Sequence, residues 1–171
     1  MKINDILLER FINLVTPAQR KPYALQVWHM INDTYEQHTS GLGPVSPEDL
    51  ILTPGVWKVA VRNGQVKGGA VYRNFKGRKL RLVFHDGTPE GKEEMKKIMR
   101  DDITHGRAWG EFSGALEKVM LRFGGKPVPN EYAERILGKP IIKYDQDGFH
   151  YWRNVGGGNV KREIIIGNPT V

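Results

Sequence analysis

The chain has 171 residues with 26 Lys or Arg and 19 Asp or Glu, which gives a net charge of +7, and it contains no cysteine. This length is enough for one domain with its own hydrophobic core. The absence of cysteine excludes a disulfide scaffold, a cysteine-based zinc site and a thiol nucleophile. The basic balance favours an anionic partner: nucleic acid, an acidic surface or a phosphorylated cofactor. We therefore expect a single domain over residues 1–171 that acts in the cytoplasm.

The first forty residues are expected to be helical. A first helix is predicted over residues 2–14, where apolar residues recur at helical spacing: Ile3, Ile6, Leu7, Phe11 and Leu14. A second helix is predicted around Leu25, Trp28, Ile31 and Tyr35. Charged residues interrupt the first segment, so it does not have the character of a signal peptide. No apolar run reaches the roughly eighteen residues that a membrane span requires.

An antiparallel meander is predicted from residue 56 onward, where apolar and polar residues begin to alternate. Asn63 and Gly64 interrupt this alternation, and this dipeptide is typical of two-residue hairpin turns. A second turn is predicted at Lys76 and Gly77, and "RKLRLVFHD" then supplies a third strand. The sequence thus predicts three consecutive strands that pair antiparallel.

A helix is expected to begin directly after the third strand, in "HDGTPEGKEEMKKIM". Thr88 suits the N-cap, Pro89 the first helical position and Glu90 the positive end of the helix dipole. Asp86 is expected to accept hydrogen bonds from the backbone amides of the turn. Two interpretations stay open. The segment is either a well-capped strand-to-helix turn or a cradle in which helix N–H groups bind phosphate.

The remaining elements complete a mixed sheet. "AWGEFS" is predicted as a strand, "SGALEKVMLRFGG" as a helix capped by Ser113, residues 130–137 as a short helix, and "GFHYWRNV" and "VKREIIIG" as strands. Consecutive strands pair antiparallel, whereas strands separated by a helix pair parallel. We therefore predict an α+β fold, with one mixed antiparallel and parallel sheet flanked by helices on both faces.

This order of elements, the turn "HDGTPEGKEEM" and the segment "GALEKVMLRFGGKPVP" resemble the GCN5-related N-acetyltransferase (GNAT) superfamily over residues 20–155, without that family's first strand. The resemblance implies a helical part at 1–40, an acyl-coenzyme A-binding core at 56–155 and a C-terminal strand at 156–171. In that superfamily the loop after the third of these strands binds the pyrophosphate of acyl-coenzyme A through backbone amides. The resemblance therefore implies transfer of an acyl group from acyl-coenzyme A to an amine.

The resemblance also implies which residues contact the cofactor: Val83, Phe84, Gly87, Thr88, Gly91 and Lys92. Two departures from the family pattern are visible. The usual glycine-rich loop sequence is absent, so only the glycines, Thr88 and Lys92 resemble an anion cradle. The family's frequent tyrosine acid, four residues before the helix-terminal glycine, falls on Met120.

Acyl transfer to an amine requires a group that takes the amine proton. His85 and Glu111 are candidate bases, because each lies at the predicted C-terminal end of a strand, where ligands gather in open α/β sheets. Ser113 or Tyr132 could give a proton to the leaving thiolate. The alternatives are structural: His85 as a strand-end hydrogen bonder, Glu111 as a salt-bridge partner and Ser113 as a helix cap.

The segment from Lys58 to Arg81 contains no acidic residue and carries the candidate nucleic-acid contacts: Lys58, Arg62, Arg73, Lys76, Arg78, Lys79 and Arg81. A solvated sheet face is the alternative. No metal is expected, because Asp101 and His105 have no third ligand.

Three hypotheses stay open. One is an N-acyltransferase, with nucleic acid among its acceptors as in bacteriophage DNA-modifying members of the superfamily. The second is a non-catalytic bacteriophage structural or DNA-binding protein on the same fold, in the virion or host cytoplasm. The third is a basic nucleic-acid-binding module of another mixed fold.

Overall fold

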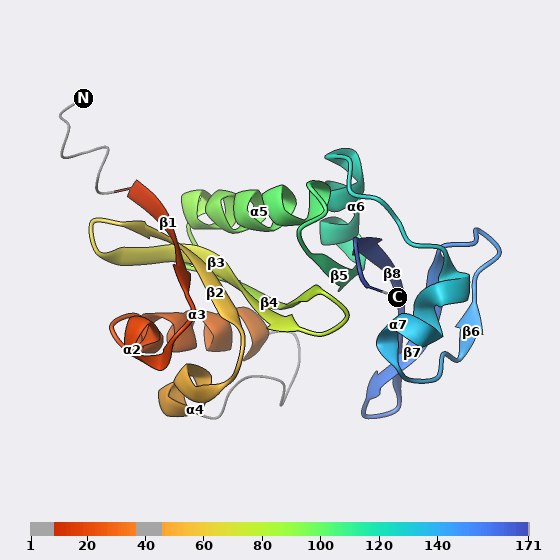
Figure 1. The fold of residues 1–171 in the computed structure, drawn as a ribbon, viewed down its shortest axis with the longest axis horizontal. Helices are drawn as coiled ribbons and strands as arrows, with labels where there is room; N and C mark the ends of the chain where they lie inside the picture. Colours follow the sequence, from red (N-terminus) through yellow and green to blue (C-terminus); the bar gives the residue numbers. More distant parts are fainter. Residues whose placement is uncertain (1–8, 37–45, 171) are drawn as a thin grey trace. The chain divides into compact units, whose positions relative to one another are not determined.

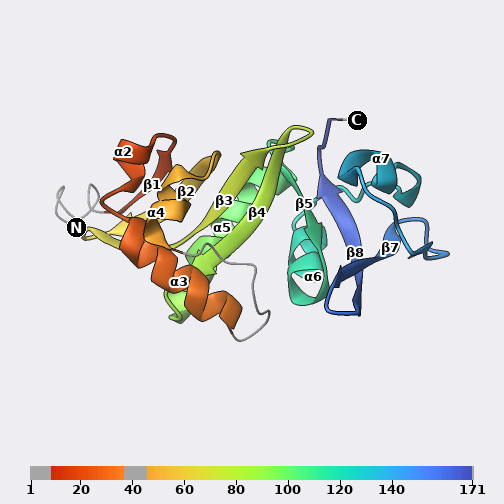
Figure 2. The ribbon, with the colours of Figure 1, turned by 90° about the horizontal axis from the view of Figure 1, so that it is seen from below.

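The computed structural model describes residues 9–36 and 46–170 (Figure 1). The described residues form two compact units. Of the residues described, the first unit takes in 9–36, 46–73 and 81–99, and the second takes in 74–80 and 100–170. Within the described part, eight strands follow one another in the order β1-β2-β3-β4-β5-β8-β7-β6. Figure 2 labels β1 to β4 of the first unit, and β5, β8 and β7 of the second, in this order.

The first unit holds the predicted meander. Its strands are β1 (Glu9–Leu14), β2 (Val56–Arg62), β3 (Gln65–Asn74) and β4 (Arg78–His85), of which the start of β4 belongs to the second unit. The hairpin between β2 and β3 turns at Asn63 and Gly64, as predicted. β4 and β5 (Trp109–Phe112) are parallel, with Lys79 opposite Trp109. The predicted mixed antiparallel and parallel sheet is therefore confirmed.

Helices cover both faces of the meander. The short helices α2 (Pro17–Arg20) and α4 (Pro47–Leu52) flank α3 (Ala24–Glu36) in sequence, and α5 (Pro89–Thr104) follows β4. Figure 1 shows α3 and α5 on opposite faces of β2 and β3. Val27 and Ile31 of α3 are buried in a core with Trp57, Val59 and Phe84 of the strands. The second predicted helix is confirmed, although Leu25, assigned to its buried face, is 60% exposed.

The predicted first helix is wrong for residues 9–14, while residues 2–8 lie outside the described part. Glu9–Leu14 forms β1, which pairs antiparallel with β2 in a register that joins Leu14 to Trp57. Phe11 and Asn13 are exposed, whereas Leu14 is buried and Ile12 packs on the core, so the side chains alternate with a period of two. Pairing with β2 overrides the helical spacing of the sequence. The strand that the resemblance lacked is therefore present.

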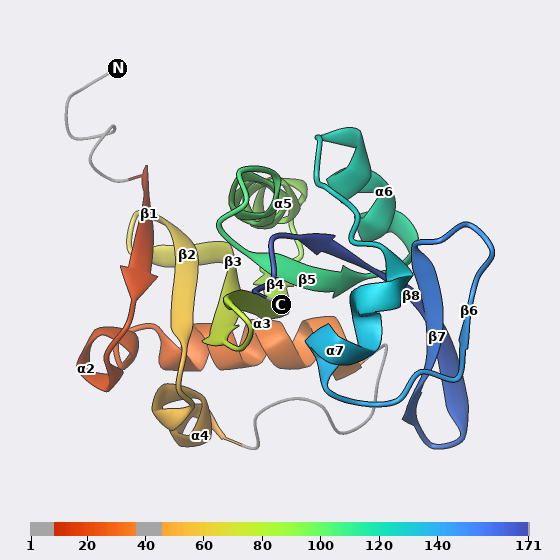
Figure 3. The same cartoon turned by 45° about the vertical axis from the view of Figure 1, so that its right-hand side comes forward.

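The second unit contains β5, β6 (Lys143–Tyr144), β7 (His150–Gly156) and β8 (Asn159–Gly167). Its helices are α6 (Gly114–Arg122), the 3₁₀ turn η1 (Asn130–Tyr132) and α7 (Ala133–Leu137). Figure 3 shows α6 and α7. Ala133 and Ile136 of α7 pack with Trp109, Tyr151 and Ile165. The other sheet face carries Ile166, against which Gly125 packs closely just after α6. The helices of this unit also cover both faces.

The described helices were checked for length and hydropathy. None of those in residues 9–36 and 46–170 combines the length with the apolar character that crossing a bilayer demands.

Candidate functional site

The turn between β4 and α5, Asp86–Thr88, borders an open cleft in the first unit. We call this the α3 cleft. Its volume is about 640 Å³, which lies in the range of small-molecule sites. α3, the first residue of β3 and the β4–α5 segment supply its lining: Gln26, His29, Met30, Asp33, Thr34, Gln65, His85, Asp86, Gly87 and Lys92. Polar side chains predominate, so the cleft suits a polar ligand.

The amides of the turn bind side chains of the turn itself. Thr88 Oγ1 accepts a hydrogen bond from Gly91 N (3.0 Å), Asp86 Oδ1 accepts one from Thr88 N (3.0 Å), and His85 Nδ1 accepts one from Gly87 N (3.0 Å). Thr88 Oγ1 also donates to Asp86 Oδ1 at 2.5 Å. The predicted N-cap at Thr88 and the predicted role of Asp86 are both confirmed.

Asp86 places a negative charge at the start of α5, where the helix dipole favours an anion. Burial alone would raise the pKa of Asp86, but hydrogen bonds from Thr88 and the charge of Lys67 lower it overall. Lys67 Nζ lies 3.4 Å from Asp86 Oδ2. The carboxylate is therefore ionised at neutral pH, and pyrophosphate would have to displace it to reach the Thr88 amide, while His85 and Thr88 occupy the Gly87 and Gly91 amides. As it stands, the turn does not fit the family's amide cradle.

Gly91 is required by close packing. An ideal Cβ on this residue would lie 2.1 Å from Asp86 Oδ1 and 2.6 Å from the carbonyl oxygen of Lys67. Val83 and Phe84 are buried, and Phe84 belongs to the core shared by the sheet and α3. Of the six residues implied as cofactor contacts, two line the α3 cleft: Gly87 and Lys92.

His85 lines the α3 cleft, and one of its ring nitrogens is bound by the turn. Its Nδ1 accepts the Gly87 amide proton, so the neutral ring carries its proton on Nε2. Burial lowers the pKa of His85, and the positive charge of Lys92 lowers it further, against the opposing effect of Asp86. A neutral ring with Nε2–H can donate to a ligand. Its one basic nitrogen is already engaged, which does not suit a general base.

Glu111, in the second unit, lies in a partly buried ionic network. Its Oε2 is 3.0 Å from Lys79 Nζ and its Oε1 is 3.1 Å from Arg153 Nε. Tyr151 OH donates to Oε1 at 3.3 Å. Burial raises the pKa of Glu111, but the charges of Lys79 and Arg153 outweigh it, so the net pKa is lowered. These contacts match the structural alternative given for Glu111, that of a salt-bridge partner. A lowered pKa also makes the carboxylate a weaker base.

The two candidate proton donors also lie in the second unit. Ser113 occupies the N-cap position of α6, but its side chain makes no capping hydrogen bond. Tyr132 ends η1, is exposed, and has the guanidinium of Arg135 5.9 Å from its ring centroid. Met120, at the position of the family's tyrosine, is buried and has no proton to give.

The seven basic residues proposed as nucleic-acid contacts do not all face solvent. Lys79 is only 12% exposed, and its Nζ lies 5.1 Å from the ring centroid of Trp109 and 5.5 Å from that of Phe75. Arg62 pairs with Glu90. The exposed members of the set are Arg73, Lys76 and Arg81, whereas Lys58 and Arg78 are partly exposed. Lys79 is thus an internal counter-ion.

The α3 side of the cleft was missed by sequence reasoning. Gln26, His29 and Asp33 line it from one helix. Their spacing of three and four residues places them on one face of α3, beside the buried stripe. A polar face at that spacing is a usable signal, but most such faces are only solvated.

Comparisons with known proteins identify the fold. No family model matches the sequence, and no curated protein matches it. Among solved structures, a candidate acetyltransferase from Acinetobacter baylyi is 16% identical with a TM-score of 0.56, over 95% of this chain and 92% of its own. A candidate acetyltransferase of the GNAT family from Desulfovibrio desulfuricans is 14% identical with a TM-score of 0.52, over 95% and 99%.

A third solved structure carries a cofactor. It is YncA, a candidate acetyltransferase from Salmonella typhimurium solved with its cofactor acetyl-CoA. It is 12% identical with a TM-score of 0.53, over 96% of this chain and 95% of its own. Identities this low establish the architecture alone. The chain has the fold of the GCN5-related N-acetyltransferases, in a divergent form.

Proposed function

We propose that the chain is an N-acyltransferase that transfers an acyl group from acyl-coenzyme A to an amine. The observation that carries the proposal is the fold, which matches structures of candidate acetyltransferases over nearly the whole chain, one of them with acetyl-CoA. Because one fold hosts many functions, the α3 cleft must also offer groups that suit the cofactor.

Side chains, not turn amides, would bind the phosphates. Lys92 supplies a cation and His85 supplies an Nε2–H donor, and both line the α3 cleft. Charge-assisted hydrogen bonds of this kind are among the stronger polar contacts. Bound acyl-coenzyme A would supply an activated thioester. In this proposal His85 is a binding residue, which replaces the base expected from its place at a strand end.

Fewer side chains are left as acceptors of the amine proton or as proton donors to the leaving thiolate than the sequence suggested. His85 has its basic nitrogen engaged, and Glu111 is bound by two cations. Transfer of the amine proton to bulk solvent through a water molecule is then the simplest route, since such proton transfers can run through one water molecule. Ser113, whose hydroxyl is not used for capping, is the first candidate to protonate the leaving thiolate, with Tyr132 as the second.

Binding of acetyl-CoA to purified protein by titration calorimetry tests the proposal. We expect binding by the wild type and about tenfold weaker binding by Lys92→Gln, the change expected for one charge-assisted hydrogen bond. Lys96→Gln is the matched control, because Lys96 lies one turn further along α5 and pairs with Glu93. Release of free coenzyme A thiol with a panel of amines then tests turnover. Equal affinities in all three proteins would exclude Lys92 from the site.

A non-catalytic protein on the same fold is the second candidate. The ionised Asp86, which accepts from the Thr88 amide, and the ion pairs that hold Glu111 both favour it. It predicts that the wild type does not bind acetyl-CoA.

Nucleic acid remains a proposed acceptor or partner for either candidate, and exposed Arg73, Lys76 and Arg81 are the proposed contacts. Affinity for duplex DNA should then fall steeply as salt rises. A flat salt response would exclude it.

A further inference from the structure

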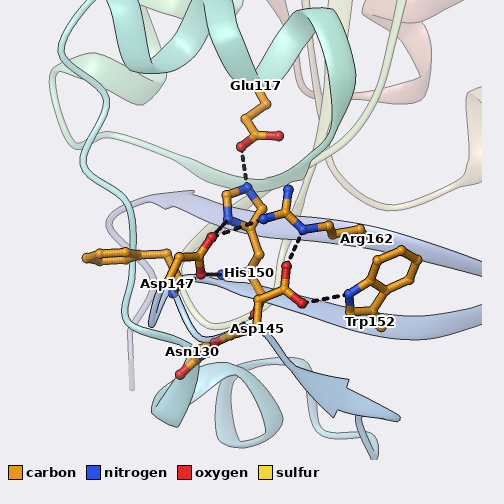
Figure 4. Close-up of polar contacts among 8 residues, drawn as sticks. Glu117, Asn130, Asp145, Asp147, His150, Trp152 and Arg162 are labelled. Carbon is orange, nitrogen blue, oxygen red and sulfur yellow. Dashed lines mark hydrogen bonds and ion pairs between the residues drawn. The ribbon is translucent and has the colours of Figure 1, made fainter.

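A second polar cluster lies in the second unit and is built from side chains to which no role has been assigned above. His150 at the start of β7 contacts two carboxylates at once (Figure 4). Its Nδ1 is 2.5 Å from Asp147 Oδ2, in the turn between β6 and β7, and its Nε2 contacts Glu117 Oε1 on α6. The side chains of His150 and Glu117 are 13% and 16% exposed. His150 therefore joins α6 to the sheet.

This arrangement requires a charged imidazole. A neutral histidine has one N–H, whereas an imidazolium donates from both nitrogens. With a carboxylate oxygen at each nitrogen, loss of the second proton would leave a lone pair facing a negative oxygen. Only one of the two contacts can survive that change. The contact between His150 and one carboxylate thus depends on protonation.

The other groups around His150 fix the turn in place. Asp147 Oδ1 accepts the backbone N–H groups of Phe149 and His150, both at 2.9 Å. Arg162 of β8 pairs with Asp147 and Asp145, and Trp152 Nε1 donates to Asp145 Oδ1 at 2.8 Å. Asn130 of η1 donates to the carbonyl oxygens of Asp145 and His150. Apart from Glu117, the partners of His150 are thus anchored.

The anchored carboxylates keep their charge. Hydrogen bonds from the His150 and Phe149 backbone lower the pKa of Asp147 to about 2 against the opposing effect of burial. A hydrogen bond from Arg162 lowers the pKa of Asp145. The guanidinium of Arg162 stays protonated. Of the groups in this cluster, the His150 imidazole is therefore the one whose loss of a proton would remove a donor from one of its two carboxylate contacts. The Asp147 contact is the better supported of the two, so the Glu117 contact is the one lost.

α6 depends on such tertiary contacts. It has nine residues, and isolated helices of that length are marginal in water. Its N-cap residue makes no side-chain cap, its first residue, Gly114, has a positive φ of 60°, and Gly124 follows its C-cap with φ 90°. Met120 is buried, and the guanidinium of Arg100 lies 4.4 Å from the Phe123 ring centroid. Glu117 tethers the first half of the helix.

We propose that His150 is a protonation-dependent latch that holds α6 on the sheet through Glu117 and releases its first half when the imidazole becomes neutral. The latch follows from the geometry of the cluster and is independent of the proposed acyl transfer. Because α6 begins directly after Ser113, the latch would also determine how well ordered the backbone is at Ser113.

Hydrogen exchange of the full chain at pH 5.5 and pH 8.0 tests the latch. Exchange rates of peptides that cover residues 114–122 are corrected for the intrinsic pH dependence with an unstructured reference peptide. In the wild type, we expect protection of α6 to fall about tenfold at pH 8.0, the effect of one lost hydrogen bond to a charged group. Glu117→Gln and His150→Gln should show the low protection at both pH values.

His105→Gln is the matched control. His105 also pairs with a carboxylate, that of Asp101, but it is exposed and lies directly after the end of α5. This variant should keep the wild-type response of α6. The wild-type comparison needs no substitution, so the test does not depend on a variant that folds. Protection of α6 that is the same at both pH values in the wild type, or a pH response that persists in Glu117→Gln, would overturn the proposal.

Discussion

Replacement of Arg20 by methionine should strongly destabilise the first unit. Arg20 is only 2% exposed, and its guanidinium contacts the ring of Trp57 at 5.5 Å. It donates to five backbone carbonyl oxygens from three segments, those of Leu14, Val15, Ile51, Thr53 and Gly55. The side chain therefore joins the end of β1, the end of α4 and the start of β2.

The magnitude follows from those contacts. A hydrogen bond to a charged group contributes about 1.5–3 kcal/mol, and a buried carbonyl left without a donor costs about 1–3 kcal/mol. The five contacts are not additive, because water can reach some of the freed carbonyls. We take about 4 kcal/mol as the expected loss. At about 2–4 °C of melting temperature per kcal/mol for a chain of this size, Arg20→Met should melt about 8–16 °C below the wild type.

Urea unfolding followed by tryptophan fluorescence measures this change, since Trp57 lies against the substituted side chain. Lys21→Met is the matched control, because Lys21 is the exposed neighbour in the chain. It should stay within about 0.5 kcal/mol of the wild type. If Arg20→Met lost less than about 1 kcal/mol, the carbonyl contacts would not stabilise the unit in the way described.

Three further predictions concern charged groups. Burial and the charge of Lys92 lower the pKa of His85. The NMR titration of His85 should therefore have a midpoint below that of free histidine, and Lys92→Gln should raise this midpoint. A midpoint that is the same in Lys92→Gln would refute the electrostatic effect of Lys92 on His85. Burial opposes the lowered pKa of Asp86, but its hydrogen bonds prevail. Asp86 therefore stabilises the fold above the unfolded pKa of about 3.9, and this contribution is lost as pH falls through the folded pKa. Urea unfolding of the wild type and Asp86→Asn should then differ at pH 6 and converge in acid. Glu111→Gln should lose about 2–4 kcal/mol, because the buried pairs with Lys79 and Arg153 lose one carboxylate while Arg153 keeps Glu163. Exposed Glu131→Gln should be nearly neutral. Equal stabilities of the two variants would refute the contribution of the network.

The order of elements from residue 56 onward could be predicted from local signals. Alternation, the Asn63–Gly64 turn and the Thr88–Pro89 helix start are properties of a few neighbouring residues, and the structure has all of them. β1 could not be predicted in this way. Its apolar residues fit both a helix and a strand, and the choice is made by pairing with β2, more than forty residues away.

The position of the candidate site in the chain could be predicted, but the hydrogen bonds and ion pairs within it could not. The sequence indicated a turn with Asp86 and Thr88 as acceptors. It could not show that their oxygens take the same amides that a phosphate would need. The tautomer of His85 depends on one contact across two residues, and the cations of Glu111 come from β4 and β7. Such contacts follow from the packed fold, and residue spacing does not encode them.

The thermal stability of the purified protein with and without acetyl-CoA tests the proposed function most directly. At one hundred times its dissociation constant, a ligand that binds only the folded state adds about 2.7 kcal/mol, which corresponds to about 5–10 °C for this chain length. We predict a shift of that size for the wild type, with adenosine 3′,5′-bisphosphate as the control for the nucleotide part, and a smaller shift for Lys92→Gln. An unchanged melting temperature at millimolar acetyl-CoA would contradict the proposal and favour a non-catalytic protein on this fold.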